Sequence, residues 1–156
     1  MSKKGKISAT DVLINIKSKF SAENGNETIE FFTKGKLEKN THSRNESDYR
    51  LTYVECEDNG YAGSLVTLGI TGNDLVTLNR DASEAFSPTN IVIERGKKHY
   101  CHYGTPYGDF MVGISANEIM SDMNDFGGNL RLKYTVDINS SFMSRNEMEI
   151  EVRPEN

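Results

Sequence analysis

Apolar and polar side chains alternate along much of this chain, and this period of two restricts the chain to a small set of folds. Between residues 130 and 138, each polar residue is followed by an apolar one, and residues 147–153 repeat the pattern with three glutamates on the polar side. Successive side chains of a β-strand point to opposite faces, whereas a helix would spread the glutamates around its circumference. The alternation therefore predicts strands that have one wet and one dry face.

Shorter stretches with the same alternation recur throughout the chain, near residues 12–16, 28–33, 49–53, 66–70, 76–78, 91–93, 99–103 and 110–114. Turn-forming glycine and asparagine lie between them, for example at 58–60, 71–74 and 126–129. This spacing predicts an antiparallel meander of about 8 to 10 strands. The wholly polar residues 38–48 predict a long loop, and residues 116–124 fit either a helical turn or a strand.

We expect a sheet of this many strands to close on itself, because an open antiparallel sheet exposes edges that promote aggregation. We therefore expect an all-β fold, an antiparallel meander closed into a calycin- or lipocalin-like β-barrel, with a two-sheet sandwich as the alternative. A barrel of about eight strands is either filled by side chains or holds one small ligand. Residues 1–8 are expected to form a flexible tail and residues 9–156 a single barrel domain.

Composition excludes several classes of protein. The chain has 36 % hydrophobic residues and no apolar run of the roughly 18 to 20 residues that a membrane helix needs. Two cysteines are too few for a disulfide scaffold, and the missing signal sequence predicts a cytoplasmic protein in which Cys56 and Cys101 stay reduced. A net charge of −5 without a cluster of arginines argues against nucleic-acid binding.

Signatures of catalysis and metal binding are missing from the sequence. It contains no nucleophile elbow, no phosphate-binding glycine loop and no zinc-protease motif, and its only histidines are His42, His99 and His102. His99, Cys101 and His102 lie together but lack the paired cysteines of structural zinc sites, so we expect Cys101 in the core and His102 in solvent. We predict no catalytic residue, no metal and no cofactor.

Arg80 is the most informative charged residue. It continues the dry-face row of Val76 and Leu78, and a guanidinium group inside a barrel needs an acidic or anionic partner. Glu55 and Glu57 share the parity of the apolar residues on a nearby strand, and one of them can supply the partner. Alternatively, Arg80 ends its strand with the head group in solvent.

Tyrosines in two segments can line a ligand site around a buried Arg80. Tyr53 lies on the strand that leads to Glu55, and the turn from Tyr103 to Gly108 contains Thr105 and Tyr107. Tyrosine supplies apolar area together with a hydroxyl group, which suits the wall of a binding site, although rim tyrosines can also close a barrel end. The predicted ligand site therefore comprises Arg80, Tyr53, Glu55, Tyr103, Thr105 and Tyr107.

Five segments together resemble the YwiB-like family of uncharacterised bacterial β-barrel proteins. In order they are Tyr53-x-Glu55, 75–80, 103–108, 127–134 and the alternating 146–152, and the likeness covers residues 10–153. The Thr-Pro-Tyr-Gly turn at 105–108 is its most specific part. The resemblance implies a calycin-like barrel in a cytoplasmic bacterial protein and implies no activity.

Three functions are compatible with these observations. The first is a non-enzymatic module that binds a small polar or anionic ligand in the barrel. The second is protein interaction, including a homodimer, through the acidic strand face of Glu147, Glu149 and Glu151. The third is an enzyme that uses Glu55 with Tyr103.

Overall fold

The computed structural model describes residues 9–23, 25–39, 48–55, 61–139 and 141–156, and within these ranges it contains strands and no helix. No helix of the described chain is thus available to span a membrane. In chain order the strands are β1 (Ala9–Ala22), β2 (Gly25–Lys39), β3 (Asp48–Val54), β4 (Leu65–Thr71), β5 (Leu75–Arg80), β6 (Thr89–Glu94), β7 (Lys98–Thr105), β8 (Gly108–Ser121), β9 (Gly128–Ile138) and β10 (Ser141–Pro154).

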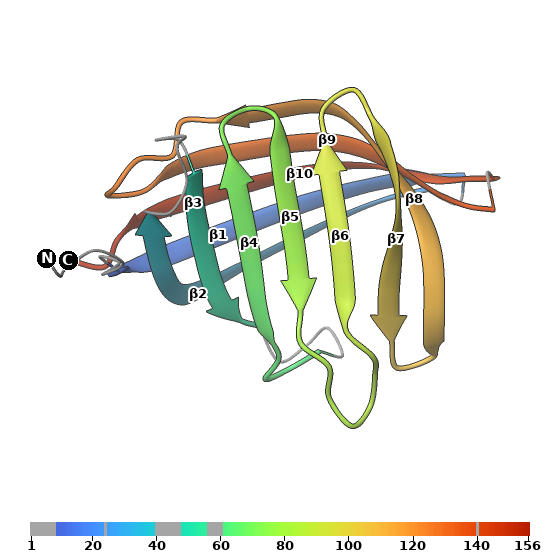
Figure 1. The fold of residues 1–156 in the computed structure, drawn as a ribbon, viewed down its shortest axis with the longest axis horizontal. Helices are drawn as coiled ribbons and strands as arrows, with labels where there is room; N and C mark the ends of the chain where they lie inside the picture. The colour runs from blue at the N-terminus through green and yellow to red at the C-terminus, as the bar shows by residue number, and fades with distance from the viewer. Residues whose placement is uncertain (1–8, 24, 40–47, 56–60, 140) are drawn as a thin grey trace, which may run out of the picture.

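Each strand pairs antiparallel with the strands before and after it in the sequence, and β1 pairs with β10 to complete a closed barrel (Figure 1). The prediction of an all-β closed antiparallel meander is confirmed, and the closed topology excludes the two-sheet alternative. The predicted tail at 1–8 and most of the predicted loop at 38–48 lie outside the described residues, although β2 extends to Lys39.

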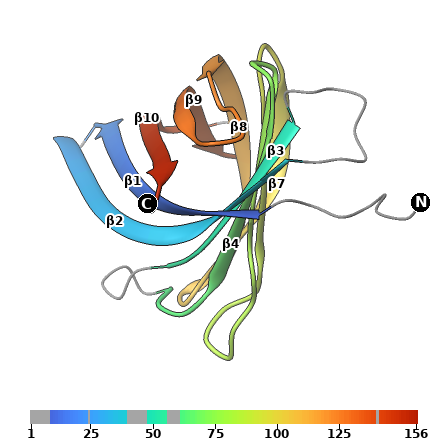
Figure 2. The same cartoon turned by 90° about the vertical axis from the view of Figure 1, so that its left-hand side faces the viewer.

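The barrel has a long side and a short side. Strands β1, β2, β8 and β10 are 14 or 15 residues long, whereas β3 to β7 have between 6 and 8 residues. The hairpins β1–β2 and β9–β10 therefore extend past the short strands at one end of the barrel (Figure 1). Figure 2, viewed from the other end, shows that the long strands β1 and β2 are strongly curved.

The ambiguous segment at 116–124 is a strand as far as Ser121. The pairing of β8 with β9 shifts by one residue between Ala116 and Glu118, which is a β-bulge. One extra residue moves the following side chains to the opposite face, so both Ala116 and Ile119 are buried. The bulge explains why this segment mimics helical spacing in the sequence.

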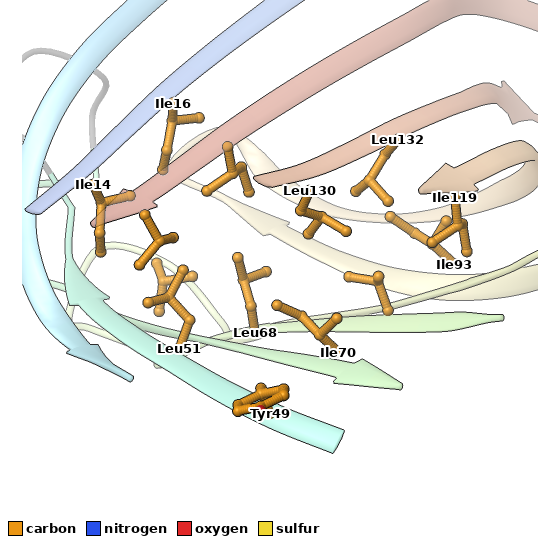
Figure 3. Close-up of a cluster of buried hydrophobic side chains, with 14 of the residues drawn as sticks. Ile14, Ile16, Tyr49, Leu51, Leu68, Ile70, Ile93, Ile119, Leu130 and Leu132 are labelled. Carbon is orange, nitrogen blue, oxygen red and sulfur yellow. The ribbon is translucent and has the colours of Figure 1, made fainter. Parts of the chain in front are cut away.

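Aliphatic side chains line the middle of the barrel. Inward-facing residues from both sides meet there and have exposed fractions of 3 % or less (Figure 3). They include Val12, Ile14, Ile16, Leu37, Leu51, Val66, Leu68, Ile70, Val76, Ile93, Ile114, Ile119, Leu130, Leu132, Ile150 and Val152. Burial of each such side chain stabilises the fold by about 1.5–3 kcal/mol.

The seam between β6 and β7 depends on side chains. Its ladder has one pair, Asn90 with His102, among the described residues. Thr89, which is fully buried, accepts a hydrogen bond at Oγ1 from the Gly104 N–H (3.0 Å) and donates one to the Gly104 carbonyl (3.3 Å). A Cβ at Gly104 would lie 2.0 Å from the carbonyl oxygen of Ser87, so only glycine permits this approach.

Replacing Thr89 with valine tests the seam. The substitution keeps the branched shape but leaves the buried Gly104 N–H without its partner, which costs about 1–3 kcal/mol of unfolding free energy. Urea denaturation measures this loss, and hydrogen exchange should accelerate at the β6 amides. Thr67→Val on the outer face of β4 is the control, with an expected change within about 0.5 kcal/mol. Equal losses in both variants would contradict the role of the hydroxyl.

Candidate functional site

Arg80 is the last residue of β5, and its side chain lies inside the barrel, with 9 % of the residue exposed. Its cross-strand neighbours are Val66 on β4 and Thr89 on β6, both fully buried. The alternation along β5 thus continues without a bulge to the end of the strand. The alternative of a solvent-facing head group is excluded by this burial.

Glu55 follows β3 directly and forms a buried ion pair with Arg80. Oε2 of Glu55 accepts hydrogen bonds from Nη2 (2.7 Å) and Nε (3.0 Å) of Arg80, and the two side chains are only 4 % and 10 % exposed. Burial opposes the charge of Arg80, but the hydrogen bonds and the charge of Glu55 outweigh it and raise the pKa of Arg80. Arg80 therefore carries a permanent charge in the barrel interior.

Two aromatic residues that the sequence did not single out complete the surroundings of this pair. The Arg80 guanidinium carbon lies 3.9 Å from the ring centroid of Tyr61, and Phe86 meets the Tyr61 ring edge-on at 4.9 Å. A cation over an aromatic face is attracted by the negative face of the ring. Tyr61 follows a turn-forming segment and Phe86 lies in a loop, so no alternation marked either residue in the sequence.

Three tyrosines extend the polar surroundings across the barrel. Burial raises the pKa of Tyr61 to about 12, and its electrostatic interaction and hydrogen bond with Tyr103 add to the effect. Burial likewise raises the pKa of Tyr134 to about 12, with a smaller contribution from Tyr103. The hydroxyl groups of Tyr61 and Tyr134 thus stay protonated to higher pH than an ordinary tyrosine and can donate hydrogen bonds.

Asn146 on β10 is a further buried polar residue, next to Tyr134. It is 6 % exposed and lies opposite Tyr134 in the ladder. We call Glu55, Arg80, Tyr61, Tyr103, Tyr134 and Asn146 the polar band, because each of them interacts with the next or lies opposite it in the sheet. The sequence did not predict the contributions of β9 and β10, since Tyr134 and Asn146 lie far from Arg80 along the chain.

Two buried atoms of the polar band have no hydrogen-bond partner within the described chain. They are Nη1 of Arg80, a donor, and Oδ1 of Asn146, an acceptor. Most buried polar atoms in native proteins are hydrogen-bonded, and an unpaired one carries a desolvation cost of about 1–3 kcal/mol. These two atoms therefore offer unused hydrogen-bonding capacity of opposite kinds.

The remaining predicted site residues, Tyr53, Thr105 and Tyr107, lie outside the polar band. Tyr53 is buried two strands from Arg80, with its ring centroid 6.4 Å from that of Phe31. The Thr105 hydroxyl donates to the Gly108 carbonyl (2.7 Å) and accepts from the Tyr107 N–H (3.0 Å), so it stabilises the turn. Tyr107 is 93 % exposed. The structure thus brings Arg80, Glu55 and Tyr103 together and leaves Thr105 and Tyr107 outside the polar band.

The segment around Cys101 has structural interactions. Cys101 is buried, where burial raises the pKa of its thiol, and its Sγ accepts a hydrogen bond from the Val92 N–H (3.4 Å). His102 is partly exposed and contacts the Pro88 carbonyl (2.8 Å). In the described part of the chain, no three histidine, cysteine, aspartate or glutamate residues cluster as metal ligands would. The prediction for Cys56 lies outside the described residues.

The glutamates of β10 face a mixture of charges. Glu147 lies opposite Lys19 on β1 and Lys133 on β9, and Glu149 lies between Lys17 and Arg131 in the same way. Arg131 forms an ion pair with Glu149 at 3.4 Å. Opposite charges across neighbouring strands stabilise a sheet. The acidity of this face is balanced locally, which weakens the basis for a docking face that selects basic partners.

Comparisons with known proteins matched a family model and a solved structure. A family model described as "Domain of unknown function (DUF1934)" matches residues 14–150. The solved structure of the ywiB protein from Bacillus subtilis superposes with a TM-score of 0.76 and 20 % sequence identity, over 95 % of this chain and 94 % of that one. No curated protein matches the sequence. At this identity the structural likeness concerns the fold alone.

Proposed function

Since this chain belongs to the family described as Domain of unknown function (DUF1934), as its YwiB-like motifs predicted, we propose its function from the barrel interior. The protein is a non-enzymatic module that binds one small polar or anionic ligand at the polar band. The single observation that carries this proposal is that Nη1 of Arg80, a buried charged donor, has no hydrogen-bond partner within the described residues.

The chemistry of the band supports an acceptor group on the ligand. Two of the donor atoms of Arg80 are committed to Glu55, so the ion pair positions the guanidinium group and leaves Nη1 for a third hydrogen bond. A carboxylate or carbonyl oxygen is the natural partner of such a donor. The face of Tyr61 against the guanidinium group fixes the plane in which that oxygen would bind.

Aromatic residues outside the polar band, together with Asn146 within it, support a ligand that also has apolar or donor groups. Phe31 and Tyr53 lie on neighbouring strands and supply aromatic surface. Oδ1 of Asn146 can accept a hydrogen bond. A binding site that combines apolar walls with a few oriented polar groups is typical of small-molecule recognition. We infer an amphipathic ligand with an acidic or carbonyl end.

Glu55 gives little support to the enzymatic alternative. A general base needs access to a proton of the substrate, whereas Oε2 of Glu55 already accepts two hydrogen bonds from Arg80. The role of Glu55 in this proposal is to hold the guanidinium group in place. Binding rather than proton transfer is therefore the function that this geometry favours.

A titration with benzoate tests the proposal. Benzoate combines an aromatic ring with a carboxylate, and benzyl alcohol provides the same ring without charge. In ¹H–¹⁵N NMR spectra, benzoate should shift the Arg80 Nε–H signal in a saturable manner, and benzyl alcohol should not. Arg80→Lys keeps a charge for Glu55 but loses the planar set of donors. Because a hydrogen bond to a charged group is worth about 1.5–3 kcal/mol, it should weaken benzoate binding about tenfold or more.

Arg50→Lys is the matched control, because Arg50 is exposed on β3 and lies 3.9 Å from Glu38. This variant should bind benzoate as the unmodified protein does. The proposal fails if benzoate and benzyl alcohol produce the same shifts, or if Arg80→Lys leaves the affinity unchanged. Native mass spectrometry of the purified protein then identifies any small molecule that co-purifies with it.

A further inference from the structure

β2 has a long edge to which no described strand is bonded. β1 pairs with β2 along its whole length, from Gly25 to Glu38, whereas β3 covers only Gly35–Lys39 on the other side. Within the described residues, the second edge of residues 25–34 is therefore open. Figure 2 shows β2 as the outer rim of the curled long strands, beyond the short strands β3 and β4.

Most of this edge lacks the features that usually prevent pairing with another chain. Such features are prolines, lysines at the edge and bulges. Residues 25–33 contain no proline and no lysine, Lys34 ends the open stretch, and β2 pairs with β1 without a shift of register. Two large apolar side chains of this stretch are exposed, Ile29 (44 %) and Phe32 (73 %). The edge is thus suited to accept a further strand.

A second copy of the chain is the occupant that this edge fits best. In an antiparallel pair related by a two-fold axis at Ile29, the two Ile29 side chains meet. Thr28 then lies opposite Glu30 of the second copy, and Glu27 opposite its Phe31. No like charges face each other in this register, whereas an axis at Glu30 would oppose two carboxylates, which destabilises a sheet.

The position of β3 limits the register further. An axis at Phe31 or Phe32 would bring the incoming strand beside Gly35, where Tyr53 of β3 is already paired. An axis at Ile29 ends the new ladder at Thr33 and avoids this collision. We propose that two copies of this chain form a two-fold dimer in which their β2 edges pair antiparallel at Ile29, joining the two barrels through one continuous sheet.

Light scattering after size exclusion tests the proposal on the full chain. The unmodified protein should elute as a dimer of twice 17.5 kDa. Ile29→Lys places two lysines against each other on the axis and should give monomers. A mixture of Ile29→Lys and Ile29→Glu should restore a dimer, because the two new charges then face each other as a pair. Val54→Lys, at a residue that is 50 % exposed on β3, is the control and should remain dimeric.

Circular dichroism separates loss of pairing from loss of folding, and recovery in the mixture does so independently. An unmodified protein that is monomeric at millimolar concentration overturns the proposal. A dimer that persists in Ile29→Lys also overturns it, since another surface must then hold the two copies. A monomer that binds an extended peptide along β2 would assign the edge to a foreign strand and would equally contradict the dimer.

Discussion

Replacing Glu55 with glutamine should lower the free energy of unfolding by about 3–5 kcal/mol, one of the two largest losses that we expect from a single substitution. Glutamine has nearly the same shape as glutamate, so packing is retained and only the charge is removed. Arg80 then stays charged in the barrel with 9 % exposure and without its counterion. The measurement is equilibrium unfolding in urea, followed by circular dichroism.

Two further variants separate the charge effect from packing. Asp11→Asn breaks the ion pair with Lys36 at 2.6 Å, but both side chains are more than half exposed, so little stability should be lost. In the double variant Glu55→Gln/Arg80→Met the unpaired charge is gone, and most of the stability should return. A double variant as unstable as Glu55→Gln alone would show that packing around Glu55, rather than the ion pair, determines the loss.

Most of the fold could be predicted from local pattern. The alternation in residues 130–138 and 147–153 assigns a face to each side chain, and the same parity places Arg80 beside Val76 and Leu78. Alternation is a property of neighbouring residues, so it requires no knowledge of distant contacts. The same parity on a second strand offered both Glu55 and Glu57 as partners of Arg80. The structure pairs Arg80 with Glu55, whereas Glu57 lies outside the described residues.

Features that depend on distant residues could not be predicted in this way. Tyr61 contacts Arg80 from a segment without alternation, and Asn146 joins the polar band through the closure of the barrel. The bulge between Ala116 and Glu118 reverses the parity in the middle of β8, and a single inserted residue has no clear sequence signal. Tertiary contacts, rather than local preference, determine these positions.

The sequence also left open whether the dry faces enclose a packed core or a cavity. The structure gives the barrel two different parts, an aliphatic centre and the polar band. If the centre is packed, removing a few methylene or methyl groups should lower the free energy of unfolding strongly. Close-packed neighbours relax only partly around the space left behind. A truncation in the centre therefore tests directly which description is correct.

Leu68→Ala is the variant that makes this test. Leu68 lies in the middle of β4, is 1 % exposed and is surrounded by inward-facing side chains of the opposite wall (Figure 3). If the centre is packed, the substitution should cost about 2–5 kcal/mol of unfolding free energy and create a dry cavity that takes up xenon or benzene. Leu65→Ala is the matched control, since Leu65 begins the same strand, faces outward and is 42 % exposed, so its loss should stay within about 0.5 kcal/mol. A loss below about 1 kcal/mol at Leu68 would mean that the barrel centre already contains empty space, and the ligand would then be sought among the aliphatic residues rather than at Arg80.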